Sequence, residues 1–96
     1  MFARVTFTQV QEDKLDEAIK VTRESVVPAA ASQTGYRGAY LLTQPTGKAI
    51  MISLWTTEED AVANERSGYY QEQLAKFKDM FSAPPVHEGY DVPLKA

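Results

Sequence analysis

The stretch Lys48–Asp60, KAIMISLWTTEED, decides the fold of this 96-residue chain. Residues 48–55 predict a strand, and successive side chains of a strand point to opposite faces. A strand that is apolar on both faces lies in the middle of a folded domain. Thr57 and the acids after it indicate a helix N-terminus, where acids complement the positive end of the helix dipole. One face of the strand carries Ile50, Ile52 and Leu54, and the other carries Ala49, Met51, Ser53 and Trp55.

The flanking sequence predicts the remaining elements. Asp13 is a candidate N-cap for a helix that kinks or ends near Pro28, because proline cannot continue the hydrogen-bond ladder. Gly38 indicates a bulge within its strand, and Ser67-Gly68 interrupts the second helix. The further strands are expected at 3–10, 36–43 and 86–92, and the second helical region at 58–81.

The resulting order, β-α-β-β-α-β, predicts a single α+β domain over residues 1–96. Right-handed crossovers turn this order into a ferredoxin-like sandwich, in which both helices cover one face of an antiparallel sheet. Because the strand at 48–55 is apolar on both faces, the uncovered face also needs a partner. In so short a chain that partner is expected to be a second copy, which predicts a homodimer.

Composition excludes several classes of function. The net charge is −3 with no basic cluster, which argues against nucleic acid and anionic membranes as partners. The chain has no cysteine and one histidine, so it offers few metal ligands, and no metal is expected. The cysteine-free composition fits a cytoplasmic protein. The N-terminus does not have the pattern of a signal peptide, and no apolar run approaches a membrane span.

Four stretches resemble one known family: Ala3–Ile19, GYRGAYLL at 35–42, IMISLW at 50–55 and SGYY at 67–70. Together they are similar to the antibiotic biosynthesis monooxygenase (ABM) family of the dimeric α/β-barrel superfamily. The resemblance implies that two sheets pack face to face across a dimer and that the pocket lies between the helices and the sheet of one subunit. It does not fix the reaction, because the superfamily includes cofactor-free oxygenases, haem degraders, decarboxylases and proteins without known activity.

The leading hypothesis is a cofactor-free monooxygenase-like enzyme that acts on an aromatic, quinol-type small molecule. A substrate phenolate or enolate would react directly with O₂ while the pocket excludes water and stabilises negative charge. The alternative is a non-catalytic dimeric domain that binds a hydrophobic metabolite or has a purely structural role. Haem is disfavoured, because residues 69–74, YYQEQL, lack the histidine that haem-degrading relatives carry there.

Five residues are candidates for substrate binding, and no residue is assigned as a catalytic acid or base. Trp55 would stack on a flat substrate, or else it is a core residue between strand and helices. Tyr69 or Tyr70 would offer a hydroxyl, and only one can face inward because adjacent helical residues diverge in direction. Asn64 would stabilise an oxyanion, although exposure to solvent is the favoured interpretation. Arg37 would bind an anionic oxygen, although an interface or surface ion pair is favoured.

His87 is the lone histidine. Its ordinary titration range would suit a general base. The favoured interpretation is a surface or edge-strand residue.

Overall fold

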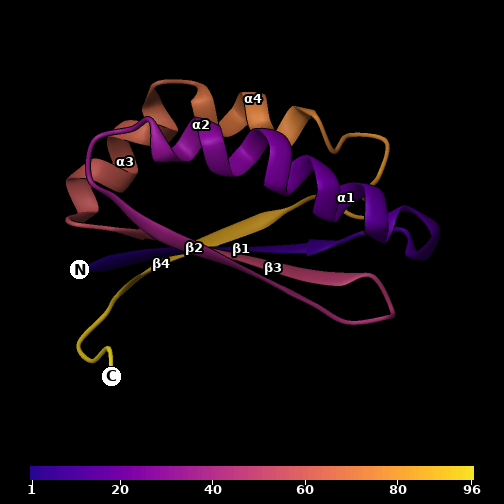
Figure 1. Ribbon diagram of the computed structural model, residues 1–96, viewed down its shortest axis with the longest axis horizontal. Coiled ribbons are helices and arrows are strands. Elements are labelled where there is room, and N and C mark those ends of the chain that lie inside the picture. Colours follow the sequence, from indigo (N-terminus) through magenta and orange to yellow (C-terminus); the bar gives the residue numbers. More distant parts are fainter.

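The structure is a computed structural model that describes residues 1–96. One antiparallel sheet in the order β2-β3-β1-β4 carries all helices on one side, as Figure 1 shows. This confirms the ferredoxin-like arrangement. The strands are β1 (Phe2–Gln9), β2 (Tyr36–Thr43), β3 (Lys48–Trp55) and β4 (Val86–Asp91), and the helices are α1 (Leu15–Val21), α2 (Val27–Ala31), α3 (Glu58–Arg66) and α4 (Tyr69–Ala75).

The second helical region begins and breaks where the sequence indicates. The Thr57 side chain accepts a hydrogen bond from the backbone N–H of Asp60 at 3.1 Å, which caps α3. Gly68 has φ +89°, a left-handed conformation that ends α3 and redirects the chain into α4. The last regular turn of α4 ends at Ala75, short of the expected Phe81, and residues 76–80 continue as turns.

The first helical region differs from the expectation in two ways. Asp13 does not cap it, because α1 is preceded by a short 3₁₀ turn at Glu12–Lys14 and has no side-chain cap. Pro28 lies in the first turn of α2, in agreement with the expected end of the first helix near this residue, but the junction has a form that the sequence does not predict. A π-helical turn, Thr22–Val26, joins α1 to α2. The wider turn changes the hydrogen-bond register just before the proline, which has no N–H to donate.

The predicted bulge in β2 is present, and it determines the side of the sheet to which Tyr36 points. The pairing with β3 shifts between Tyr36 and Gly38, so that Arg37 is the extra residue. Tyr36 is therefore opposite Trp55 and packs edge-on against its ring, 5.9 Å between centroids. It does not share a face with Tyr40, because a bulge reverses the alternation that an uninterrupted strand would keep.

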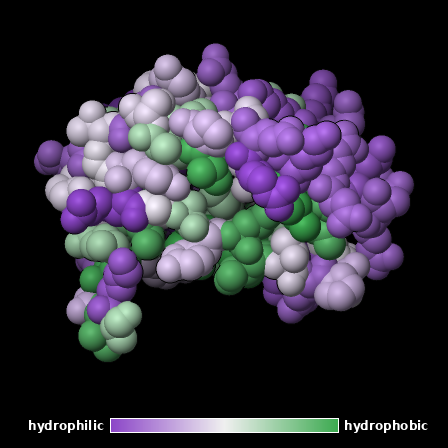
Figure 2. Space-filling view, in the orientation of Figure 1, coloured by the Kyte–Doolittle hydropathy of each residue, from purple (hydrophilic) through white to green (hydrophobic).

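The main core lies between the sheet and the helices. Trp55 is fully buried there, and Val10 and Phe77 belong to an apolar core cluster, which also contains Ala18, Ala49 and Met80. The other side of the sheet has no covering layer. It exposes about half of Tyr40, Leu42 and Val86, and Figure 2 shows hydrophobic residues along this lower side of the molecule. None of the helices is long and apolar enough to span a membrane.

Candidate functional site

The central strand β1 turns its polar face toward the helices. Arg4 and Thr6, which share a face by alternation, are only 6% and 4% exposed, and Thr8 lies partly buried on the same side. The apolar face with Val5 and Phe7 points to the open side of the sheet. Buried polar side chains on a central strand need partners inside the protein, and α3 and α4 supply them.

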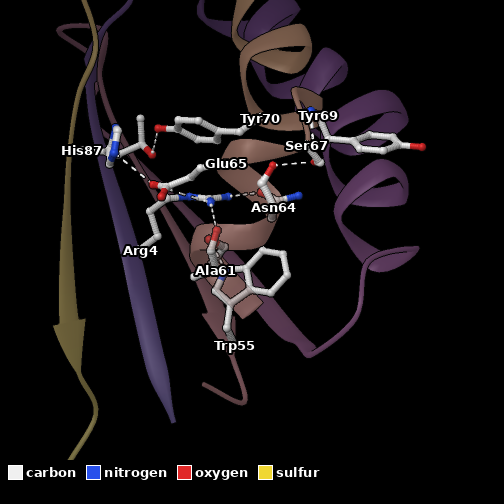
Figure 3. Close-up of polar contacts among 11 residues, drawn as sticks. Arg4, Trp55, Ala61, Asn64, Glu65, Ser67, Tyr69, Tyr70 and His87 are labelled. Atoms are coloured by element: carbon white, nitrogen blue, oxygen red, sulfur yellow. Dashed lines mark hydrogen bonds and ion pairs between the residues drawn. The ribbon is translucent and has the colours of Figure 1, made fainter. Parts of the chain in front are cut away.

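Arg4 is the centre of this buried polar cluster (Figure 3). Its guanidinium donates to the backbone oxygen of Ala61 at 3.3 Å and to Oδ1 of Asn64 at 2.9 Å. It also lies 4.1 Å from the centre of the Tyr70 ring and 5.4 Å from that of Trp55. These contacts hold a cation between two aromatic faces, an arrangement that favours the charged form.

A carboxylate and a histidine complete the cluster at its outer edge. Glu65 on α3 and His87 on β4 are 3.0 Å apart, measured from Oε1 to Nε2, and the His87 side chain is about half exposed. The same Glu65 oxygen is 3.9 Å from Nη1 of Arg4. His87 also packs edge-on against the Tyr70 ring, 5.2 Å between centroids. The lone histidine therefore lies on an edge strand, as expected, and contacts the cluster.

Tyr70 is the member of the cluster that carries a reactive hydroxyl. Its oxygen is 2.8 Å from the Thr6 hydroxyl. Burial raises the pKa of Tyr70 above its ordinary value of 10.0, and the hydrogen bond with Thr6 and the charge of Arg4 only partly oppose this effect. Burial also lowers the pKa of Arg4, although a guanidinium remains charged at neutral pH. At neutral pH the site thus presents a protonated phenol and a cation.

The raised pKa of Tyr70 makes the fold sensitive to alkali. In the unfolded chain this hydroxyl ionises near pH 10, whereas in the folded protein it stays protonated to higher pH. The unfolded state then binds fewer protons, so stability is expected to fall as the pH rises above about 10. Urea unfolding of wild type and Tyr70→Phe between pH 8 and ~11 measures this, and the variant should lose less stability. Equal losses of stability in the two proteins would contradict this prediction. Tyr36 and Tyr90 also have raised pKa values, so the variant should still lose some stability as the pH rises.

Two adjoining cavities lie beside the cluster. The larger, about 70 Å³, is bounded by apolar side chains of the sheet, α1 and α4, together with the hydroxyl-bearing Thr6, Thr8 and Tyr70. The smaller, about 30 Å³, lies between α2, α3 and α4 and is bounded by Arg4, Asn64, Tyr69 and Ala30, among others. Both cavities are bounded in part by Val26, Tyr70 and Gln73.

The five sequence candidates are placed differently with respect to these cavities. Tyr70 borders both cavities, whereas Asn64 and Tyr69 border only the smaller one. Trp55 is 0% exposed and donates from its indole nitrogen to Oγ of Ser53 at 2.9 Å, and it borders neither cavity. Arg37 is an exposed residue of the β2 bulge. The structure thus places Asn64, Tyr69 and Tyr70 at the cavities, Trp55 beside Arg4 but away from the cavities, and Arg37 on the surface.

The structure corrects the expectation that Asn64 is exposed to solvent, and it adds three residues to the candidate site. Asn64 is 5% exposed instead of solvated, because its carbonyl oxygen accepts from the buried Arg4. Arg4, Thr6 and Glu65 were not proposed as site residues. The alternation of β1 does place Arg4 and Thr6 together on one polar face. It does not show whether this face points toward the helices or toward the open side of the sheet, because either side can be covered if the chain forms a dimer.

The structure contains no group of three His, Asp or Glu side chains placed to hold a metal ion. The cavities and the polar cluster instead offer hydroxyl, amide and guanidinium donors. Such donors can orient an aromatic ligand and stabilise negative charge on it.

Comparison with known proteins agrees with the fold and the layout of the chain. The family model for antibiotic biosynthesis monooxygenase matches residues 1–76. The chain belongs to the ABM family. An uncharacterized protein of Mycobacterium tuberculosis strain H37Rv is 30% identical over 97 aligned positions, which cover 96% of this chain and 41% of that protein. This ABM chain therefore spans about two-fifths of the length of the curated relatives it matches.

Solved structures show the same fold at low identity. A Nitrosomonas europaea protein named for the ABM family superposes with a TM-score of 0.79 at 18% identity, over 98% of this chain and 100% of that one. SnoaB, a cofactor-independent oxygenase from Streptomyces nogalater, gives a TM-score of 0.74 at 12% identity, over 98% and 94% of the two chains. At these identities the likeness establishes the fold alone.

Proposed function

We propose that this ABM protein is a cofactor-free monooxygenase-like enzyme that acts on a quinol-type aromatic small molecule. The observation that carries the proposal is the apolar cavity with the partly buried, protonated hydroxyl of Tyr70 at its polar edge. Membership of a monooxygenase family and a fold shared with a cofactor-independent oxygenase support it.

The cavity suits a reaction that starts from a substrate anion. Apolar walls formed by residues such as Leu74 and Phe77 exclude water, which makes each polar contact inside stronger. The Tyr70 hydroxyl donates to the phenolate or enolate oxygen and stabilises the charge there. The carbanion carbon gives two electrons to O₂ and forms a hydroperoxide, which then loses water. Overall, a quinol, whose keto tautomer has a ring CH₂ group, and O₂ yield a product with a C=O group at that carbon and H₂O.

The volume of the cavity restricts the substrate. At about 70 Å³ it is smaller than the ~150 Å³ apolar cavity that accommodates benzene, and much smaller than the ~300 Å³ at which ligand pockets usually begin. A single-ring quinol therefore binds only when the helical wall moves outward. A tricyclic anthrone needs a far larger displacement, so single-ring substrates are the better match.

A second candidate function is that of a non-catalytic domain that binds a hydrophobic metabolite. Two observations favour it: the small volume, and the fact that Tyr70 is the only titratable residue bordering the larger cavity. A catalyst of proton abstraction normally positions a base within hydrogen-bond reach of its substrate. In the monooxygenase proposal the substrate must therefore enter already ionised or lose its proton to water.

Oxygen uptake separates the two functions. Purified protein stripped of metal is mixed with single-ring hydroquinones, naphthohydroquinones and anthrones, and O₂ consumption is compared with the spontaneous rate. The monooxygenase proposal predicts O₂ uptake above the spontaneous rate, with one O₂ consumed per carbonyl formed. The ratio of catalysed to spontaneous uptake should be highest for single-ring compounds. Saturable binding of the same compounds without extra uptake would instead support the binding domain.

We also propose that the open face of the sheet forms a homodimer. Its apolar residues include Tyr40 and Leu42 on β2 and Ile52 on β3, and exposed apolar faces of this kind are typical of association surfaces. A two-fold interface uses the same face on both copies, so this one sheet face can supply both halves of the interface. Its occupant is therefore a second copy of this chain.

Tyr40→Asp is expected to turn the dimer into a monomer at micromolar concentration. Tyr40 is 58% exposed in the single chain, so the fold tolerates the change, while the symmetric interface receives two desolvated charges at once. Light scattering should fall from twice the 10.7 kDa chain mass to one chain. Ser32→Asp places the same charge on an exposed turn away from the sheet and should remain dimeric. A wild-type mass of one chain would refute the dimer.

A further inference from the structure

The buried charge of Arg4 has no hydrogen-bonded counter-ion. The guanidinium donates to two neutral oxygens, those of Ala61 and Asn64. The nearest carboxylate oxygen, Oε1 of Glu65, is 3.9 Å away, and it is also the oxygen that lies 3.0 Å from His87. A charge that is 93% buried is costly unless an anion pairs with it at hydrogen-bonding distance.

The smaller cavity lies beside this charge, whose only carboxylate neighbour is the long Glu65 contact. Arg4 and Asn64 both border it, and Asn64 is 5% exposed. The Asn64 amide oxygen is engaged by Arg4, but its amide nitrogen donates no hydrogen bond within the protein and points away from Arg4 in Figure 3. A volume of about 30 Å³ holds about two waters, which is roughly the space of one carboxylate group.

The two cavities adjoin each other. Val26, Tyr70 and Gln73 border both cavities, and Arg4 and Asn64 give the smaller one its polar side. Gln73 accepts from Oγ of Ser25 at 2.9 Å on the partly buried rim and can exchange that contact for water. One ligand can therefore place an apolar ring in one cavity and a polar group in the other.

We propose that the smaller cavity is a subsite for an acidic group and that the ligand of this site is an aromatic ring bearing a carboxylate. The carboxylate binds the Arg4 guanidinium and the free amide nitrogen of Asn64, and the ring occupies the apolar cavity. This rests on the proposed function only in placing the ring in the apolar cavity. Two charge-assisted contacts in a water-poor site supply both affinity and orientation.

The acid preference is tested by binding. 2,5-Dihydroxybenzoate and its amide, 2,5-dihydroxybenzamide, have the same quinol ring and nearly the same shape but differ in charge. Calorimetry at pH 7.5, buffered above the ~pH 4 range where carboxyls ionise, should show the acid binding about 10- to 100-fold more tightly. Equal affinities, or no binding of the acid at millimolar concentration, would overturn the proposal.

A second test needs no ligand. In Asn64→Asp a carboxylate replaces the amide whose oxygen is 2.9 Å from Arg4, so the protein itself supplies a hydrogen-bonded counter-ion. The melting temperature should rise by about 4–8 °C. The preference for the acid over the amide should fall to about twofold or less, because the new charge repels the benzoate.

Gln71→Glu, on the exposed side of α4, is the control that adds equal charge elsewhere and should change neither the melting temperature nor the preference for the acid. A lower melting temperature in Asn64→Asp would show that Arg4 already has its counter-ion.

The two proposals fail in different ways. Tight binding of 2,5-dihydroxybenzoate with no O₂ uptake above the spontaneous rate leaves the acid subsite intact and refutes the monooxygenase. O₂ uptake that is equal for the acid and its amide, at concentrations below saturation, supports the monooxygenase and refutes the subsite.

Discussion

Trp55→Ala is expected to lower the free energy of unfolding by about 3–5 kcal/mol, the range for deleting a buried large aromatic side chain. Trp55 is 0% exposed and packs against Tyr36, while its indole nitrogen donates to Ser53. The substitution removes these contacts and leaves a cavity that the sheet and helices cannot fully close. Because a domain of this size has a total stability of only about 5–15 kcal/mol, the variant should be largely or partly unfolded at 37 °C.

Urea unfolding followed by far-ultraviolet circular dichroism measures the loss. Trp55→Phe keeps an aromatic ring in the same place and should lose roughly half as much or less. Leu94→Ala removes an apolar side chain that is 81% exposed and should change stability by less than about 0.5 kcal/mol. A loss below about 1 kcal/mol in Trp55→Ala would contradict the central place of this residue in the core.

Tyr70→Phe is expected to lower kcat by about 100-fold or more on any quinol that the protein oxidises, the loss typical of removing one oxyanion donor. The ring stays in contact with Arg4 and His87, so the fold loses only the hydrogen bond with Thr6, about 1 kcal/mol. Because the hydroxyl acts on charge that develops during reaction, KM should change far less than kcat.

Tyr90→Phe is the control for this prediction. Tyr90 lies on β4, is 47% exposed and borders neither cavity. Initial rates of O₂ uptake for wild type and both variants decide the matter. If Tyr70→Phe retains more than a third of the wild-type kcat, the hydroxyl is not the oxyanion donor and the mechanism proposed for the larger cavity fails.

The sequence predicted the fold because each local signal agreed with the global arrangement. Thr57 caps α3, Ser67-Gly68 separates α3 from α4, and Gly38 marks the bulge in β2. Asp13 was misassigned as a cap because several acids compete at the same helix start, and only backbone geometry selects among them. The π-helical turn before Pro28 was missed for a related reason: proline indicates a break, but neighbouring contacts decide how the chain accommodates it.

The candidate site was predicted only in part. Tyr70 and Asn64 were named from residue type and from their place near the helix break, and the structure puts both at the cavities. Arg4 was not named, although it is the charge around which Asn64, Glu65 and Tyr70 gather. These residues are about 60 positions away from Arg4 along the chain, and no periodicity links positions so far apart.

The sequence by itself determined the order of strands and helices and the two-sided apolar character of β3, since both follow from alternation and from local start and stop signals. Only the tertiary structure decided which face of β1 points inward. That choice buries Arg4 and Thr6 beneath α3 and α4 and leaves Val5 and Phe7 on the open side. The physical reason is that a strand pattern has two equivalent orientations, and only the partners that α3 and α4 provide for buried polar groups make one of them stable.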